Sequence, residues 1–178
     1  HNRLTARQLE NSPGVRNFLE YAKVKFFTQT FNEKYLNKLE VFRALKNAPH
    51  ASKYLPESHE LSANRLRLMC EKYRTVFLKP NTGSSGRGII RVEHSPPSGY
   101  ICYFTCTSGT RKRNFTSFQA MASALRKKIK GRLYQIQQGL NLIQISGRPV
   151  DFRALVQKDA KGEWKITTLA ARVAGPGQ

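Results

Sequence analysis

The 178-residue sequence carries 31 lysine and arginine side chains against 11 aspartates and glutamates, a formal net charge of +20. Its hydrophobic content of 39% is sufficient for a folded core, which excludes a wholly disordered chain. It has neither the ~18 consecutive apolar residues of a membrane helix nor the apolar core of a secretory signal. We therefore expect a soluble, cytosolic protein without a membrane span, whose charge requires an anionic partner or serves a highly soluble surface.

The two ends of the chain suggest a fragment of a longer protein. The first residue is histidine rather than methionine, and the last five residues, Ala174 to Gln178, are turn-like. Residues 1–35 show weak periodicity, with one short helix expected after Pro13. We interpret them as an arm or the remnant of a preceding domain.

In the next segment, apolar residues recur at helical spacing between positions 39 and 45. Asn37, followed by Glu40 three residues later, is typical of a capping box. These features predict a helix over 38–46. Ser62 is the expected cap of a second helix with an apolar face.

Three strands are expected after the second helix, over 75–79, 88–93 and 100–105. A glycine-rich loop, 83–88, joins the first two strands. A Walker loop or a dinucleotide fingerprint leads into a helix instead, so neither fits. A loop that closes a hairpin can fold over phosphate groups through backbone N–H donors, with Lys79 placing an ammonium group beside them. The alternative is an ordinary glycine-rich hairpin.

The second half of the chain is strongly basic, because no acidic residue lies between His94 and Val150. A helix capped by Thr116 or Ser117 and ended by Gly131 is predicted there, with cations in its last turn. A strand over 134–138 and a hairpin formed by 150–157 and 163–173 follow. The cations in this region are Arg111, Lys112, Arg113, Arg126, Lys127, Lys128, Lys130, Arg132 and Arg148.

The three cysteines, Cys70, Cys102 and Cys106, are an odd number and are best interpreted as buried structural thiols. A zinc site would need a second Cys/His pair at ligand spacing, and His94 is the histidine nearest to this run. We predict no metal site and no disulfide.

Five ordered segments resemble the ATP-grasp superfamily and, more narrowly, the YheC/YheD-like family of endospore coat-associated proteins. The resemblance extends from about residue 24 to the C-terminus. The segments are Asn37 to Phe42, Leu55 to Ser58, Val76 to Ile89, Ile136 to Leu140, and Arg148 to Arg153.

The resemblance implies an α+β ATP-grasp fold, in which two α/β lobes with antiparallel sheets enclose a nucleotide cleft. Residues 36–135 would form the first lobe with its glycine-rich lid, and 136–178 an incomplete start of the second lobe. The version present here would be truncated.

The resemblance also implies roles for individual residues. Lys38 and Lys79 resemble the two lysines that reach the phosphates, and Gln137 and Gln138 resemble the segment that pairs with adenine, with glutamine where many relatives carry an acidic residue. Lys38 could instead be a solvated helix residue. The implied ATP-binding positions are Lys38, Lys79, Gly83, Ser84, Ser85, Gly86, Arg87, Gly88, Gln137, Gln138 and Leu140.

Two arginines, Arg153 and Arg172, resemble the catalytic cations that steady the transferred phosphoryl group and the acyl-phosphate. The alternative for Arg153 is an exposed strand face paired with Asp151. Arg172 could simply cover a face of a sheet.

The implied reaction is ATP-dependent activation of a carboxylate as an acyl-phosphate, which an amine or a thiol then attacks. Mg²⁺ would take part in a complete homologous chain, but after Glu93 this sequence has only Asp151, Asp159 and Glu163 as carboxylates. We therefore expect the chain alone to be inactive. The alternative function is a non-catalytic basic scaffold that binds an acidic polymer, nucleic acid, spore-coat proteins or the spore surface.

Overall fold

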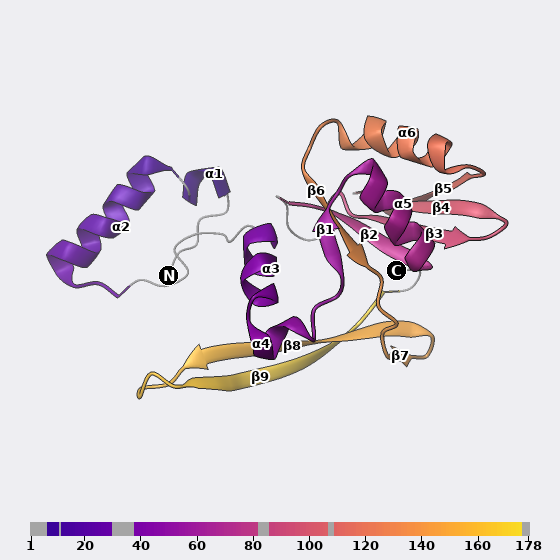
Figure 1. The fold of residues 1–178 in the computed structure, drawn as a ribbon. Helices are drawn as coiled ribbons and strands as arrows, with labels where there is room; N and C mark the ends of the chain where they lie inside the picture. The colour runs from indigo at the N-terminus through magenta and orange to yellow at the C-terminus, as the bar shows by residue number, and fades with distance from the viewer. Residues whose placement is uncertain (1–6, 11, 30–37, 82–85, 107–108, 176–178) are drawn as a thin grey trace. The chain divides into compact units, whose positions relative to one another are not determined.

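The computed structural model describes residues 7–10, 12–29, 38–81, 86–106 and 109–175 (Figure 1). These residues divide into two compact units, His1–Gln138 and Gly139–Gln178, and each is described by itself. The strand over 134–138 pairs within the first unit, and the second unit begins at Gly139.

The helices of the described residues all lie in the first unit. None of these helices is both long and apolar enough to cross a membrane. Their bounds are α1 Arg7–Glu10, α2 Pro13–Phe26, α3 Lys38–Lys46, α4 Pro49–Ser52, α5 Ala63–Lys72 and α6 Phe118–Ile129.

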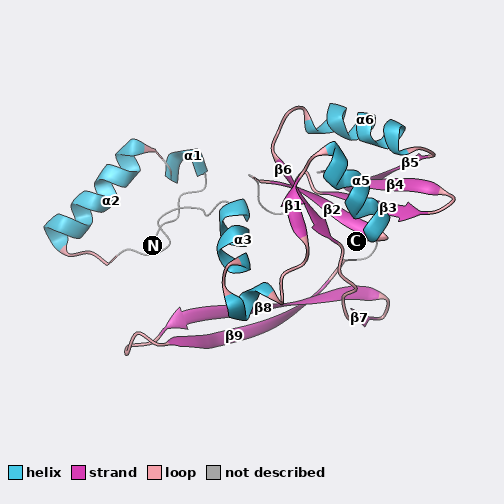
Figure 2. Cartoon of the chain, viewed as in Figure 1, coloured by secondary structure: helices cyan, strands magenta, loops and turns pink. Residues whose placement is uncertain are grey.

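The first unit contains a six-stranded sheet in the order β1-β6-β2-β3-β4-β5, and every neighbouring pair is antiparallel (Figure 2). The second unit contains a three-stranded sheet in the order β7-β8-β9. The chain is therefore of the α+β class, as predicted. The strands are β1 Ser58–Glu60, β2 Thr75–Pro80, β3 Ile90–Ser95, β4 Gly99–Cys106, β5 Gly109–Phe115, β6 Tyr134–Gln138, β7 Gln144–Ile145, β8 Arg148–Lys158 and β9 Trp164–Val173.

Alternate residues give the six-stranded sheet two different faces. Val76 and Leu78 of β2 are fully buried, whereas Phe77 and Lys79 between and beside them are half-buried. The buried face packs against the apolar stripes of α5 and α6, which form the core with it. The opposite face is called the open face below. The core residues contributed by the two helices are Leu66, Met69, Cys70, Met121, Leu125 and Ile129.

The predicted helices begin where their capping residues indicate. The Ser62 hydroxyl accepts a hydrogen bond from the Arg65 N–H at the start of α5, and Ser117 does the same for α6. At the end of α6 the left-handed residue is Lys130, with φ of 51°, so the helix ends at Ile129, before Gly131. The predicted cap at Asn37 lies outside the described residues.

The glycine-rich loop connects β2 and β3, which pair with each other in antiparallel register. This arrangement is the strand-loop-strand connection that the sequence predicted. Strand β5 was not predicted, because its residues are almost all polar and exposed; it joins the sheet through its pairing with β4. The predicted hairpin in the second unit is present as β8 and β9.

Candidate functional site

Two lysines meet at the end of β2 where the glycine-rich loop begins. The Lys38 ammonium, from the first turn of α3, donates a hydrogen bond of 3.2 Å to the Pro80 carbonyl. Lys79 precedes Pro80 on β2, and its pKa is lowered from the ordinary lysine value by burial and then by the positive charge of Lys38. The two residues expected to reach phosphates are therefore electrostatic neighbours.

Gln137 belongs to the same group of side chains. Strands β2 and β6 pair so that Phe77 lies opposite Gln137, which places Gln137 and Lys79 on the same face. The Lys79 ammonium donates a short hydrogen bond to the Gln137 Oε1 and lies 5.7 Å from the centre of the Phe77 ring. Because both causes of the pKa shift disfavour the charged ammonium, an anion bound here would stabilise it.

Gln138 is engaged elsewhere. Its side-chain oxygen accepts from the Glu57 N–H at 3.1 Å, and its own N–H donates to the Glu57 carbonyl at 2.8 Å. These contacts tie β6 to the segment before β1. The Gln138 side chain is thus a structural link, and its predicted adenine contact has no separate support from this geometry.

The described end of the glycine-rich loop is a turn over residues 86–89. Gly86 and Gly88 have φ of 72° and 75°, and the Ile89 N–H donates to the Gly86 carbonyl. The Tyr134 hydroxyl donates to the Gly88 carbonyl at 3.0 Å, which anchors the turn to β6. Both glycines adopt the left-handed conformation that ordinary residues avoid. Arg87 lies in the same turn and is exposed, whereas the predicted loop positions Gly83, Ser84 and Ser85 lie outside the described residues.

Three residues near the lysines were missed by the sequence interpretation. Phe77 lies under the Lys79 ammonium, and Tyr134 anchors the loop from 46 positions away. Asn81 is 5% exposed, and no donor among the described residues reaches its Oδ1. Asn81 could have been noticed from its place between Lys79 and the glycines, whereas no local signal marks Tyr134.

The two predicted arginines lie in the second unit, on β8 and β9. Arg172 pairs with Asp151 through two hydrogen bonds, with Nε 2.8 Å from Oδ1 and Nη2 in contact with Oδ2. The Arg172 hydrogen bonds lower the pKa of Asp151, and the charge of Arg153 contributes in the same direction. The three side chains therefore share one face of the hairpin. Leu140, also in the second unit, is 53% exposed.

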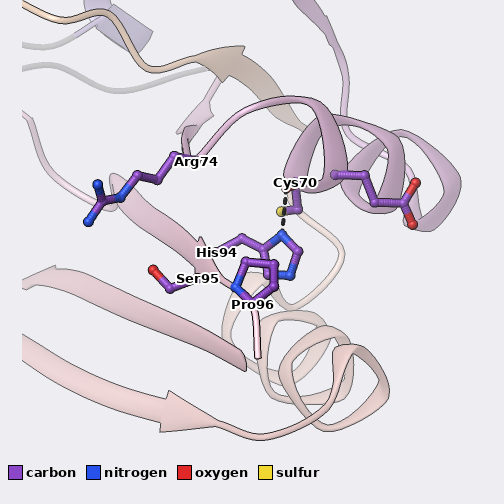
Figure 3. Close-up of a pocket in the computed structure, with 6 residues that line it drawn as sticks. Cys70, Arg74, His94, Ser95 and Pro96 are labelled. Carbon is purple, nitrogen blue, oxygen red and sulfur yellow. Dashed lines mark hydrogen bonds between the residues drawn. The ribbon is translucent and has the colours of Figure 1, made fainter. Parts of the chain in front are cut away.

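A pocket of about 410 Å³ lies at the opposite end of β3 from the glycine-rich loop (Figure 3). His94 lies there with its Nδ1 2.8 Å from the Cys70 carbonyl, where it covers the C-terminal turn of α5, and its ring stacks on Tyr100. These contacts give His94 a structural role. The pocket is lined by Cys70, Glu71, Arg74, His94, Ser95 and Pro96.

Two of the three cysteines match the prediction of buried thiols, and Cys106 does not. Cys70 and Cys102 are buried free thiols, and burial raises the pKa of each to about 12. Cys106 is a free thiol of intermediate exposure. Among the described residues, no three His, Cys, Asp or Glu side chains gather where they could hold a metal ion.

A helix-backed antiparallel sheet with a glycine-rich strand connection and two adjacent lysines is consistent with the class of ATP-grasp domains. The chain belongs to the YheC/D-like ATP-grasp family, which matches it over residues 28–178.

Among curated proteins, the chain is similar to two from Bacillus subtilis (strain 168). It is 25% identical to the endospore coat-associated protein YheD over 176 residues, 98% of this chain and 39% of YheD. It is 26% identical to the endospore coat-associated protein YheC over 163 residues, 90% of this chain and 43% of YheC. The chain thus spans less than half the length of either relative. No solved structure matches it significantly.

Proposed function

We propose that this chain is the nucleotide-binding part of an ATP-dependent ligase that activates a carboxylate as an acyl-phosphate. The observation that carries the proposal is the convergence of Lys38, Lys79 and Gln137 beside the glycine-rich loop. Two adjacent ammonium groups, one of them buried enough to lower its pKa, form an electrostatic site for a polyphosphate. The family membership supports the same function.

In the proposed reaction, a carboxylate oxygen of the substrate attacks the γ-phosphorus of ATP, and ADP leaves. An amine or thiol then attacks the acyl carbon and releases inorganic phosphate. The contribution of the protein is charge neutralisation and positioning. Lys38 and Lys79 would stabilise the phosphate oxygens, and the Gln137 side chain orients the Lys79 ammonium.

Arg153 and Arg172 are proposed to steady the transferred phosphoryl group. Arg172 already holds Asp151 through both of its contacting nitrogens, so its guanidinium is oriented before any substrate arrives. Arg153 lies on the same face and is exposed. Of the two, Arg153 is therefore the more available for an incoming anion.

Mg²⁺ is implied by the family, but the described residues do not fit it. Asp151 is committed to Arg172, and Asp159 accepts the Lys161 and Glu163 N–H groups at the turn of the hairpin. Association with the spore coat is proposed on the similarity to YheD and YheC alone.

Calorimetric titration with ATP tests the proposed function. The chain should bind one equivalent, and Lys79→Ala should weaken binding about tenfold or more, because it removes a charge-assisted contact to phosphate. Lys127→Ala, an exposed change on α6 with the same loss of charge, is the control and should leave binding nearly unchanged. Equal effects of the two substitutions, or no saturable binding, would contradict the proposal.

A second candidate function is a basic scaffold for an acidic polymer, nucleic acid or the spore surface. It is favoured by the exposed cations Arg111 to Arg113 on β5 and Arg126 to Lys128 on α6. Binding of this kind would weaken steeply with salt and would be indifferent to the chemistry of the anion. In the same titration it would appear as uptake of any polyanion that Lys79→Ala does not change.

A further inference from the structure

Four side chains form a row across the open face of the six-stranded sheet. Phe77 on β2 lies opposite Arg91 on β3, Arg91 lies opposite Tyr103 on β4, and Tyr103 lies opposite Lys112 on β5. Figure 1 shows the strands β2 to β5 from which these side chains come. We call Arg91, Tyr103 and Lys112 the cationic row; it begins one strand away from Lys79.

The cationic row is ordered by its central ring. The Arg91 guanidinium carbon lies 4.0 Å from the centre of the Tyr103 ring, and the Lys112 ammonium lies 6.0 Å from it. The two cations come from the strands on either side of Tyr103. Stacking on the ring fixes the guanidinium before a ligand arrives, which reduces the entropy that binding costs.

Arg91 retains unused hydrogen-bonding capacity. In the described part of the chain its ion pair, from Nη2 to the Glu93 Oε1, is long at 3.4 Å. Its Nε has no acceptor there either but is buried, so a ligand would have to use the two terminal nitrogens. The other Glu93 oxygen accepts from the Tyr103 hydroxyl at 3.1 Å. The guanidinium is thus held in place without a bidentate partner, which is the kind of partner that a carboxylate or phosphate provides.

We propose that the cationic row binds an acidic peptide, and that a carboxylate of this peptide is the group activated by ATP. The assignment of the peptide as substrate rests on the proposed function, whereas the binding itself does not. On this face Lys79, Arg91 and Lys112 carry positive charge, and only Glu93 among the described charged side chains of β2 to β5 opposes them. The surface therefore attracts a ligand with several negative charges.

Peptide rather than nucleic acid is favoured by the aromatic rings. Nucleic-acid surfaces use free ring faces on which bases stack. Here Tyr103 is flanked by Arg91 and Lys112, and Phe77 has the Lys79 ammonium 5.7 Å from its centre. The rings thus hold the cations in place instead of offering free faces to bases, and the cations are the groups that would bind carboxylates.

The spacing of the two cations selects a sequence pattern for the peptide. Two strand steps separate the backbones of Arg91 and Lys112, about 9.6 Å at the usual distance between strands. Their charged ends lie 4.0 Å and 6.0 Å from the same ring centre, which allows a separation of this size. In a polyproline II peptide every third side chain points in the same direction, and these side chains are about 9.3 Å apart along the axis. A peptide with glutamate at every third position should therefore reach both cations.

Fluorescence anisotropy of a labelled peptide of Glu-Pro-Pro repeats tests the proposal, with Gln-Pro-Pro repeats as the uncharged control. We expect the double variant Arg91→Gln, Lys112→Gln to bind the peptide about tenfold more weakly or worse. The matched control is Lys127→Gln, Lys128→Gln on α6, which removes the same charge from exposed positions and should change affinity less than about twofold. Arg91→Lys keeps the charge and should still weaken binding, because lysine lacks the planar guanidinium that can donate two parallel hydrogen bonds to one carboxylate.

Three results would overturn the proposal. The double variant of the cationic row and the α6 double variant could lose peptide affinity equally, or the cationic-row variant could keep its peptide affinity. An oligodeoxyadenylate could also compete more strongly for the chain than unlabelled peptide does. ATP titration of the same variants separates this proposal from the proposed function. A row variant that keeps both ATP and peptide binding refutes the peptide surface alone. Peptide binding to the cationic row in a chain that takes up no ATP supports the surface and refutes its substrate role.

Discussion

The cluster around Glu57 gives the stability of the first unit a defined dependence on pH. The Glu57 carboxylate, directly before β1, accepts hydrogen bonds from the Lys72 ammonium at 2.6 Å and the Tyr73 hydroxyl at 2.8 Å, and lies 2.9 Å from the His59 Nε2. The contacts to Lys72, His59 and Tyr73, in that order, lower the pKa of Glu57 to about 2. The cluster connects β1 with the end of α5.

A lowered carboxyl pKa stabilises the folded state only while the carboxylate is ionised. The contribution is fully present above the ordinary pKa of 4.5 and is lost as the pH falls toward about 2. The shift corresponds to at most about 3.4 kcal/mol. Because the Glu57 and Lys72 side chains are 31% and 60% exposed, solvent screening reduces the expected value to about 1–2 kcal/mol.

Glu57→Gln should therefore lower the free energy of unfolding by about 1–2 kcal/mol at pH 7 and by much less near pH 2. Urea unfolding at several pH values measures this difference. Glu60→Gln, an exposed change on β1, is the control and should have little effect at either pH. A deficit in Glu57→Gln that is the same at pH 7 and near pH 2 would refute the reasoning, because it could not come from the ionised carboxylate.

Two further predictions concern the loop and the thiols. In thermal melts, Gly88→Ala should destabilise the chain by about 2 kcal/mol, since its φ is 75° and the added Cβ would lie 3.3 Å from a tyrosine hydroxyl. Gly86→Ala is the control: its φ is 72° but the added Cβ would meet open space, so it should cost about 1 kcal/mol. Equal losses would mean that the close contact is unimportant. At pH 8 a disulfide reagent should modify Cys106 first, because Cys70 and Cys102 are buried with pKa values of about 12; rapid modification of all three thiols would contradict the burial.

The parts of the fold that could be predicted are those with local signals. Helices α5 and α6 can be predicted from the spacing of their apolar residues and a capping serine, and β2 from the alternation of its apolar residues. Strand β5 has almost no apolar residues, and β1 has only three residues, so neither carries a pattern of its own. Both exist because a neighbouring strand offers backbone hydrogen bonds.

The candidate site could be predicted only as far as motif order allowed. The family resemblance assigned Lys38 and Lys79 to the phosphates and Gln137 to the adenine segment. By itself Lys38 could have been a solvated helix residue, whereas the position of Lys79 before the loop was already a signal. The contact between Lys79 and Gln137 joins positions 58 apart, and the one between Tyr134 and Gly88 joins positions 46 apart. Contacts of this range depend on which strands pair, and strand pairing is not encoded in local spacing.

If Lys79 and its neighbour Lys38 form a site for an anion, the pKa of Lys79 should respond to ATP. NMR titration of the lysine Nζ groups, with Lys79→Arg to assign the resonance, measures this value in the free chain and with saturating ATP. We expect a Lys79 pKa below that of an exposed lysine in the free chain, because of burial and the Lys38 charge, and a rise of this pKa when ATP is bound. An ordinary pKa that ATP does not change would mean that the two lysines form no anion site.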